Sequence, residues 1–195
     1  IGYRGASRYI NDQDVFHLEV LAIKSVLAKY SNLNVMIPFV RTPEEMASVK
    51  KLLEEEGLSR DSGLKLWMMV EVPSNVILLD EFLDVGIDGV SIGSNDLTQL
   101  TLGVDRDNAK LEAVFDERNA AVMKSLEKVI TTASKRGVTS SICGQAPSFY
   151  PDLTEKLVEW GVTSVSVTPD MIDQTRDIIA RVEKKQGKLP AQDQD

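Results

Sequence analysis

The chain has 195 residues, of which 43% are hydrophobic and 27% charged, which is enough for one substantial buried core. Its formal net charge of −8 argues against nucleic acid or an anionic membrane as a partner, but not against a small anionic ligand at a local site. A single cysteine excludes an internal disulfide framework and a cysteine-rich zinc site, and no apolar stretch approaches the roughly 18–20 residues that cross a bilayer, so a cytoplasmic location is expected.

The chain opens on Ile1 and the segment GYRGASRY. A natural start inside such a Gly- and Arg-rich turn is unusual, so we expect a part of a longer chain. Arg4 and Arg8 are candidate anion binders, because arginine presents a planar fork that suits phosphate or carboxylate. Arg4 also lies between Gly2 and Gly5, where the backbone can approach a ligand closely.

Strand-like and helix-like segments alternate along the chain, which is typical of parallel βαβ units with right-handed crossovers. Five strands are too few for a complete eight-stranded barrel but fit the C-terminal portion of a (β/α)8 TIM-type barrel, without its first strands. We expect residues 1–186 to form this portion and residues 187–195 to be a disordered tail. An open five-stranded doubly wound sheet is the alternative that spacing leaves open. The predicted strands are Asn34–Val40, Leu64–Glu71, Gly89–Gly93, Val138–Cys143 and Ser164–Val167, and the predicted helices are about Asp14–Lys29, Pro43–Gly57, Asn75–Val85, Glu117–Lys135, Leu153–Trp160 and Met171–Lys185.

Helix boundaries are marked by familiar residue types. Thr42-Pro43-Glu44-Glu45 combines a Thr cap, a Pro at the first helical position and a Glu placed to close a capping box. Helices should stop at four glycines, because glycine adopts the left-handed backbone of a helix end at little cost. These glycines are Gly57, Gly86, Gly137 and Gly161.

The strand Leu66–Val70 is a continuous apolar run, as expected of a strand buried on both faces of a parallel sheet. It runs directly into Glu71, ahead of a helix start at Ser74-Asn75. Because an unpaired buried carboxylate is costly, Glu71 needs a partner.

The next strand-like run, Val90–Ile92, stops at Gly93 and is followed by Ser94, Asn95 and Asp96 before a helix-like pattern resumes. Barrels of parallel strands place their chemistry at such strand ends. The oxygens of Asn95 and Asp96 suit a hard cation such as Mg²⁺ or a polar substrate. The alternative is that Asp96 merely caps the helix.

Glu71 and Asp96 end consecutive strands, so both carboxylates should converge at one edge of the sheet. Two adjacent carboxylates repel unless a cation or a proton lies between them, which predicts a Mg²⁺ or Mn²⁺ site. A salt bridge to a Lys or Arg is the alternative. Arg106, shortly after Asp96, is a third candidate anion binder, although its neighbours Asp105 and Asp107 also allow a surface ion pair.

Cys143 ends another apolar strand, in SSICGQAPS. A lone cysteine is often a small buried hydrophobe, but its place at the same edge as Glu71 and Asp96 favours proton transfer or nucleophilic chemistry. A Cys-His pair is poorly supported, since the one histidine, His17, lies in the helix-like segment DVFHLEVL and is better explained as a surface or packing residue. No GxxxxGK[ST] phosphate loop occurs.

Six segments together resemble one family. GYRGASRY, VMIPFVRT, MMVEVPSN, VSIGSNDLTQLTLGVDRDN, FDERNAAV and SICGQAPS, in this order, are similar to the C-terminal barrel of the phosphoenolpyruvate-utilising enzymes. IPFVRT, EVPSN and CGQAPS are most similar to the synthase branch. The dikinase and sugar-phosphotransferase branches typically show CGE and a Gly-containing segment where this chain has Cys143-Gly144-Gln145-Ala146-Pro147.

The resemblance implies a site for pyruvate or phosphoenolpyruvate with a Mg²⁺ or Mn²⁺ ion. Cys143 would exchange a proton with C3 of the substrate, Arg106 would lie near the phosphoryl group, and Arg4 would stand at the mouth of the site. Glu71 and Asp96 would bind the metal ion and also contact the substrate. Three residues just before Asp96 would line the substrate site, namely Gly93, Ser94 and Asn95.

The resemblance also implies partners. In the family, the enolate of pyruvate accepts a phosphoryl group from a phosphohistidine, which an ATP-grasp domain of the same full-length chain loads from ATP. Members of the family commonly form a homodimer through their C-terminal barrel. The phosphohistidine motif, a Thr-x-His-Ala-like segment, does not occur in this sequence, and His17 does not match it. We therefore expect this chain alone not to complete the reaction. A non-catalytic module for ligand binding or dimerisation is the alternative.

Overall fold

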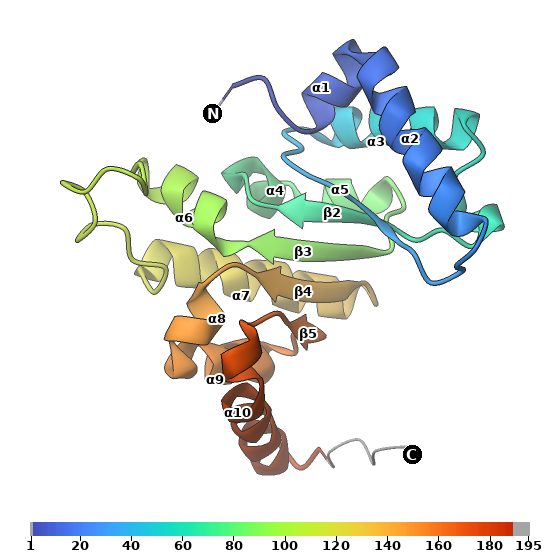
Figure 1. Ribbon diagram of the computed structural model, residues 1–195. Coiled ribbons are helices and arrows are strands. Elements are labelled where there is room, and N and C mark those ends of the chain that lie inside the picture. The colour runs from blue at the N-terminus through green and yellow to red at the C-terminus, as the bar shows by residue number, and fades with distance from the viewer. Residues whose placement is uncertain (1, 189–195) are drawn as a thin grey trace. The chain divides into compact units, whose positions relative to one another are not determined.

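The computed structural model describes residues 2–188, which divide into two compact units with their boundary between Ser91 and Ile92, inside strand β3 (Gly89–Gly93). Five parallel strands alternate with helices, so the parallel α/β fold predicted from the sequence is confirmed (Figure 1). The five predicted strands are all present. The third has the predicted bounds, whereas the first is Val35–Ile37 rather than Asn34–Val40 and the last is Ser164–Val165 rather than Ser164–Val167.

The sheet of the first unit follows the order β1-β2-β3. β1 (Val35–Ile37) pairs in parallel with β2 (Leu66–Val70), with Val35 opposite Leu66. In β2 the residues alternate between buried and half-buried, which fits a strand covered on both faces. A pair of hydrogen bonds between Leu66 and Asp88, at 2.7 and 2.8 Å, ties the start of β2 to the approach to β3.

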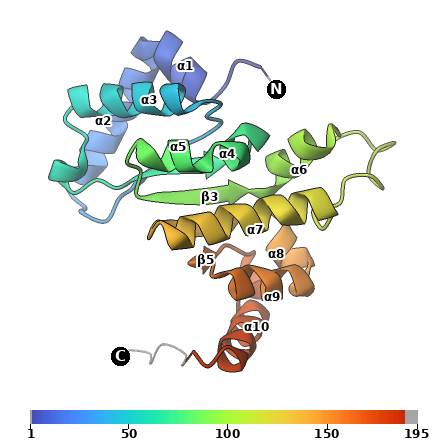
Figure 2. The ribbon, with the colours of Figure 1, turned by 180° about the vertical axis from the view of Figure 1, so that it is seen from behind.

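Helices of the first unit surround these strands. The short helix α1 packs against α2 and α3, as Figures 1 and 2 both show. The predicted helix over 75–85 is divided in two at Leu78, whose backbone (φ −104°, ψ 31°) leaves the helical region. The helices are α1 (Ala6–Asn11), α2 (Gln13–Leu27), α3 (Pro43–Glu55), α4 (Pro73–Ile77) and α5 (Leu79–Asp84), with a 3-10 turn η1 at Arg60–Ser62.

The start of α3 confirms most of the predicted cap. The Thr42 hydroxyl accepts from the Glu45 N–H at 3.2 Å, and Pro43 takes the first helical position. The Glu45 carboxylate, however, accepts from the N–H of Arg41 at 2.7 Å rather than from that of Thr42. The reciprocal bond is therefore shifted by one residue and ties the helix to the loop before it.

In the second unit β4 (Thr139–Cys143) pairs in parallel with β5 (Ser164–Val165), in the order β3-β4-β5. Helix α7 packs on β4 and on α9. Helix α10 packs on α9 (Figure 2). The buried residues of α7 recur at helical spacing, from Val122 to Ala133, which is why this segment forms an amphipathic helix. The helices are α6 (Ser94–Leu102), α7 (Ala120–Lys135), α8 (Ala146–Phe149), α9 (Pro151–Trp160) and α10 (Ile172–Lys185), with a 3-10 turn η2 at Pro169–Met171.

Smaller predictions have mixed outcomes. The four predicted helix-ending glycines all have φ between 66° and 92°, as expected. His17 lies half-exposed on α2, with Nδ1 2.9 Å from Oε1 of Glu56, which confirms a surface role. Residues 189–195 of the predicted tail lie outside the described residues. Among residues 2–188 no helix has both the length and the apolar character of a membrane span.

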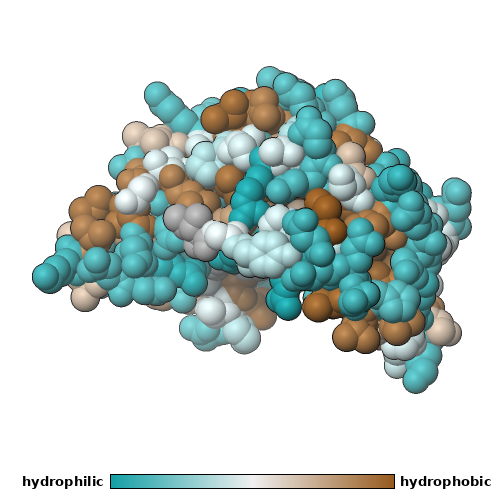
Figure 3. Space-filling model, turned by 90° about the horizontal axis from the view of Figure 1, so that it is seen from above, coloured by the Kyte–Doolittle hydropathy of each residue, from teal (hydrophilic) through white to brown (hydrophobic). Residues whose placement is uncertain are grey.

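The surface mixes apolar and polar residues. On the face drawn in Figure 3, hydrophobic residues form patches separated by hydrophilic ones. On α2, Leu18 and Leu21 are exposed although Phe16 and Val20 of the same helix are buried.

Candidate functional site

Glu71 is held by the backbone of the loop after β1. The residue follows the last position of β2 and is only 5% exposed. Its Oε1 accepts a hydrogen bond from the N–H of Phe39 at 2.6 Å. A short bond to a backbone donor stabilises the ionised carboxylate, so Glu71 has the kind of partner that its burial requires.

Asn75 fixes the backbone on which Glu71 stands. Its Oδ1 accepts from the N–H groups of Glu71 and Val72, at 3.2 and 2.9 Å, and its Nδ2 donates to the Val40 carbonyl at 2.7 Å. The side chain is completely buried. Three bonds from one amide join the end of β2 to the loop after β1. Sequence reasoning read Asn75 only as a helix start and missed this function.

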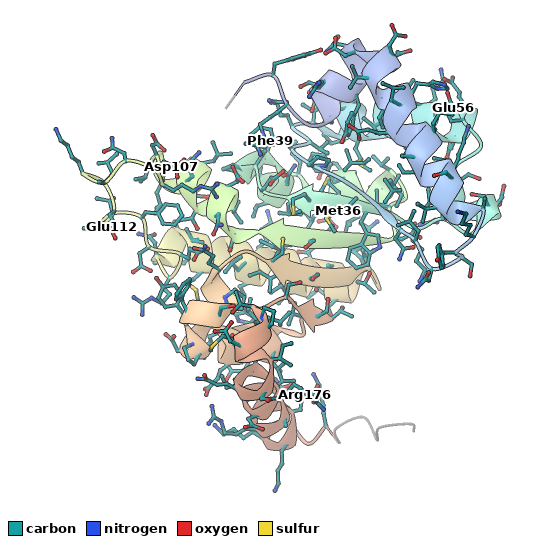
Figure 4. All side chains as sticks on the ribbon, viewed as in Figure 1. Met36, Phe39, Glu56, Asp107, Glu112 and Arg176 are labelled. Carbon is teal, nitrogen blue, oxygen red and sulfur yellow. The ribbon has the colours of Figure 1, made fainter. Side chains whose placement is uncertain are left out.

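Phe39 connects Glu71 with Arg4. Phe39 is buried and has φ 47°, a left-handed backbone that is uncommon outside glycine. While its N–H is directed to Glu71, its ring contacts two arginines, with the Cζ of Arg4 and of Arg41 at 4.4 and 4.8 Å from the ring centroid. Figure 4 labels Phe39 in this loop. Two predicted site residues, Arg4 and Glu71, thus meet at one residue that the prediction did not include.

Gly5 lets the N-terminal segment approach Phe39. A Cβ at this position would lie 2.3 Å from the Pro38 carbonyl oxygen and 2.6 Å from the Cβ of Phe39. Only glycine fits at this position. The sequence predicted a close backbone approach in Gly2-Tyr3-Arg4-Gly5, and here the approach is to the loop after β1. Arg8, by contrast, lies on α1 with Nε 3.9 Å from Oδ2 of Asp12, and both are largely exposed. The structure therefore does not join Arg8 to this cluster.

In the second unit, Ser94 and Cys143 come together at the ends of β3 and β4. The buried Ser94 hydroxyl donates to the Cys143 carbonyl at 3.2 Å, and the Sγ of Cys143 lies 3.6 Å from the Ile92 carbonyl. Cys143 is half-buried rather than enclosed in the core. Its thiol is thus placed beside the predicted substrate-lining segment.

Gly144 brings the backbone after Cys143 against this segment. It has φ 115°, and a Cβ here would lie 2.4 Å from Ser94 Oγ and 3.4 Å from Asn95 Oδ1. Any residue larger than glycine at position 144 would therefore push the backbone next to Cys143 away from Ser94.

Glu117 is a functional candidate that sequence reasoning missed. It is 5% exposed, and its Oε1 has no hydrogen-bond partner among the described residues. Burial raises the pKa of the Glu117 carboxyl, the Ser94 hydroxyl opposes this by hydrogen bonding, and the charge of Asp116 adds to the rise. The signal was present in FDERNAAV, which contributed to the resemblance without any residue of it being assigned a role.

Two further predicted residues lie around α6. Asp96 belongs to the first turn of this helix, but the N-cap is Gly93, so the interpretation of Asp96 as the cap is wrong. The Arg106 N–H donates to Gln99 Oε1 at 3.1 Å, and its Nε lies 3.8 Å from Oδ1 of Asp107, both side chains being exposed. Figure 4 labels Asp107 on the loop between α6 and α7. The surface ion pair allowed by the sequence is therefore present.

The metal site expected at Glu71 and Asp96 stays a prediction, since the two residues belong to different units. Among the described residues, no group of three or more His, Cys, Asp or Glu side chains is arranged to hold a metal ion. The chemistry of the predicted donors nevertheless fits Mg²⁺, because carboxylate oxygens are the ligands that hard cations prefer.

Sequence comparison extends these observations over the whole chain. A family model described as the PEP-binding domain of PEP-utilising enzymes matches residues 1–184. The chain is 52% identical over 191 residues to a phosphoenolpyruvate synthase of Aeropyrum pernix, covering 95% of this chain and 23% of that protein. Relatives of the same name in Pseudomonas aeruginosa and Aquifex aeolicus are 51% and 46% identical over 90% and 97% of this chain. The chain spans less than a quarter of these relatives, 22–23% of their length.

Structural comparison supports the fold. RipC from Yersinia pestis superposes with a TM-score of 0.54 at 11% identity, over 82% of this chain and 70% of that one. An aldolase/citrate lyase family protein from Burkholderia cenocepacia gives 0.53 at 15% identity, over 78% and 65%. At such low identity the likeness concerns the fold alone.

Proposed function

The chain belongs to the family of PEP-utilising enzymes as its PEP-binding domain, and we propose that it supplies the pyruvate and phosphoenolpyruvate site of a phosphoenolpyruvate synthase. The observation that carries the proposal is the position of the Cys143 Sγ, 3.6 Å from the Ile92 carbonyl and therefore beside the substrate-lining segment, whose Ser94 hydroxyl donates to the Cys143 carbonyl. The match to three full-length synthases at 46–52% identity supports it.

The proposed overall reaction converts ATP, pyruvate and water to AMP, phosphoenolpyruvate and phosphate. The relatives are about four times as long as this chain, which leaves room for an ATP-grasp domain and a phosphohistidine domain in the same polypeptide. The homodimer and the cytoplasmic location expected from the sequence stay predictions.

In this proposal Cys143 moves the proton of the half-reaction. As a thiolate, its Sγ accepts a proton from the methyl C3 of pyruvate while the carbonyl becomes an enolate. The enolate oxygen then takes the phosphoryl group, whose bond to the histidine nitrogen breaks. Gly93, Ser94 and Asn95 line the substrate, and Arg4 and Arg106 neutralise charge on the phosphoryl group.

Glu71 and Asp96 would hold the Mg²⁺ or Mn²⁺ ion. When bound, such a cation polarises the pyruvate carbonyl and stabilises the negative charge of the enolate. The bond from Phe39 N–H orients the Glu71 carboxylate, which prepares it for this role.

The experiment replaces the corresponding domain of a full-length synthase by this chain and tests Glu71→Gln, Asp96→Asn and the double variant. Each single change should weaken Mg²⁺ binding and lower kcat by at least about 100-fold, and the double variant should be little worse, because residues acting as a unit are not additive. Glu112→Gln, on the exposed loop labelled in Figure 4, is the matched control. Near-normal activity of both single variants at low Mg²⁺ would refute the metal site.

A further inference from the structure

Arg41 joins separate elements of the first unit. Its backbone N–H donates to Oε2 of Glu45 in α3, and its carbonyl accepts from the Ser74 hydroxyl in α4, each at 2.7 Å. Its side chain reaches the N-terminal segment, where Nη1 donates to Ser7 Oγ at 3.0 Å and Nη2 donates to the Gly2 carbonyl. With its backbone anchored on two helices, the guanidinium group is a fixed support for the segment it holds.

The segment held by this guanidinium group is the turn that carries Arg4. Gly2 and Ser7 lie on either side of Arg4 in the sequence, and the Arg4 carbonyl is 3.5 Å from Nη1 of Arg41. The Ser7 hydroxyl donates to the same carbonyl at 3.1 Å. Two nitrogens of one planar fork thus span the turn, an arrangement that the compact ammonium of lysine cannot reproduce.

The Phe39 ring supports both arginines. Their guanidinium carbons lie 4.4 and 4.8 Å from its centroid, within the range of a cation–π contact. Two like charges that contact the same ring repel each other, and the Glu45 carboxylate, 4.0 Å from Nη1 of Arg41, offsets part of that repulsion. The charge of Arg41 is therefore partly balanced by Glu45, and Arg4 is exposed.

We propose that Arg41 is a positioning residue that, with the Phe39 ring, presents Arg4 to the phosphoryl group of phosphoenolpyruvate without contacting the ligand itself. The inference rests on the proposed function, because it requires an anionic ligand at Arg4. An arginine already held in place loses less conformational freedom on binding. We call the contacts of the Arg41 guanidinium group with Gly2, Arg4 and Ser7 the clamp. Loss of the clamp should weaken ligand binding more than it slows the chemical step.

The experiment compares Arg41→Lys and Arg41→Met in the full-length synthase that carries this domain. Both variants should raise KM for phosphoenolpyruvate by about 3- to 10-fold, the cost of ordering one long side chain, with kcat changed by less than about twofold. Arg60→Met is the matched control, since Arg60 pairs with Asp88 at 2.8 Å in the same unit and takes no part in this cluster.

A second readout does not depend on activity. Amide hydrogen exchange over Ala6–Asn11, a segment anchored by the bond from Ala6 N–H to the Pro38 carbonyl at 3.1 Å, should be faster in both variants. Exchange over β4 should be unchanged, which would show that the variants are folded. Ser7→Ala, which removes one partner of the clamp, should give the same change at smaller amplitude.

The outcomes separate three explanations. Raised KM together with faster exchange in both variants supports the clamp. A lysine variant with normal KM would show that Arg41 acts through its charge, and unchanged exchange would show that it holds no turn; either result overturns the proposal. If the unsubstituted chimera does not bind phosphoenolpyruvate, the proposed function fails, and the exchange measurement still tests whether Arg41 holds the turn.

Discussion

The candidate residues of the two units lie in differently built surroundings. Around Glu71, the polar groups are held by backbone donors and by the buried amide of Asn75. Around Cys143, the Ser94 hydroxyl donates to the Cys143 carbonyl, whereas the buried Oε1 of Glu117 has no partner among the described residues.

This difference matches what each region would do in the proposed function. A carboxylate that holds a cation needs a fixed position, which the short bond from the Phe39 N–H provides. A thiol that moves a proton needs neighbours that can change partners during turnover, and unsatisfied donors and acceptors leave that freedom at a cost in stability. Hydrogen bonds thus fix the first region, and the second holds a buried carboxylate oxygen without a partner among the described residues.

Gly5→Ala should have the largest effect on stability, because it challenges the first region. The new Cβ would collide with the carbonyl of Pro38 and the Cβ of Phe39, neither of which can rotate away. We expect a loss of about 3 kcal/mol or more in the free energy of unfolding, measured by urea titration. Gly63→Ala is the control, since Gly63 also has positive φ (83°) but open space around it. Equal losses in both variants would contradict the claim of a rigid contact.

Gly144→Ala should cost less stability and more activity. Its Cβ would meet Ser94 Oγ, a side-chain atom that can move, so we expect about 1–3 kcal/mol of destabilisation but about a 100-fold fall in kcat as Cys143 is displaced. Adding Ser94→Ala should restore part of the stability and none of the activity. Gly103→Ala, at φ 65° with open space, is the control. A double variant no more stable than Gly144→Ala would contradict the contact.

Glu117→Gln should change how stability depends on pH. Burial raises the pKa of Glu117, so the folded state keeps a proton that the unfolded chain releases above its ordinary pKa of 4.5. The stability from this proton is complete below that pH and is lost as the pH rises through the raised value. The variant should therefore match the natural chain near pH 4 and have a higher Tm at pH 7–8. If Tm changed with pH in the same way in the variant and in the unsubstituted chain, the claim that burial raises the pKa of Glu117 would be contradicted.

Glu56→Gln should have the smallest effect. Hydrogen bonds from Lys24 and then His17 lower the pKa of Glu56, so its contribution is present above the ordinary pKa and lost as the pH falls. Because the Glu56 side chain is 31% exposed, solvent screens the interaction, and we expect Tm at pH 7 to be nearly unchanged. A large decrease would show that surface carboxylates matter as much as the buried Glu71, contrary to the comparison.

The strands were predictable from sequence, whereas the hydrogen bonds that hold their polar ends were not. The apolar run Leu66–Val70 and the run ending at Gly93 indicate buried parallel strands, and polar residues follow directly on both. The interpretation of Asp96 as a helix cap was wrong because the helix begins at Ser94, directly after Gly93, which left Asp96 inside the first turn.

Phe39, Asn75 and Glu117 escaped prediction for physical reasons. An aromatic residue in a left-handed backbone violates the preference on which sequence reasoning depends, so no pattern announces it. Asn75 binds groups up to 35 positions away in the sequence, at Val40, which only the fold brings near. A carboxylate such as Glu117 is normally placed on the surface, and only its burial reveals it.

The most direct test of the account is the exchange of pyruvate methyl protons with solvent by a full-length synthase that carries this domain with Cys143→Ala. We predict that ATP-dependent phosphorylation of the histidine is intact, whereas methyl exchange and overall synthesis fall by about 10²–10⁴-fold, the contribution of a general acid–base group. A rate of methyl exchange within about tenfold of that of the unsubstituted enzyme would contradict the account and leave Cys143 a packing residue. Loss of histidine phosphorylation together with methyl exchange would contradict the assignment of Cys143 to one half-reaction.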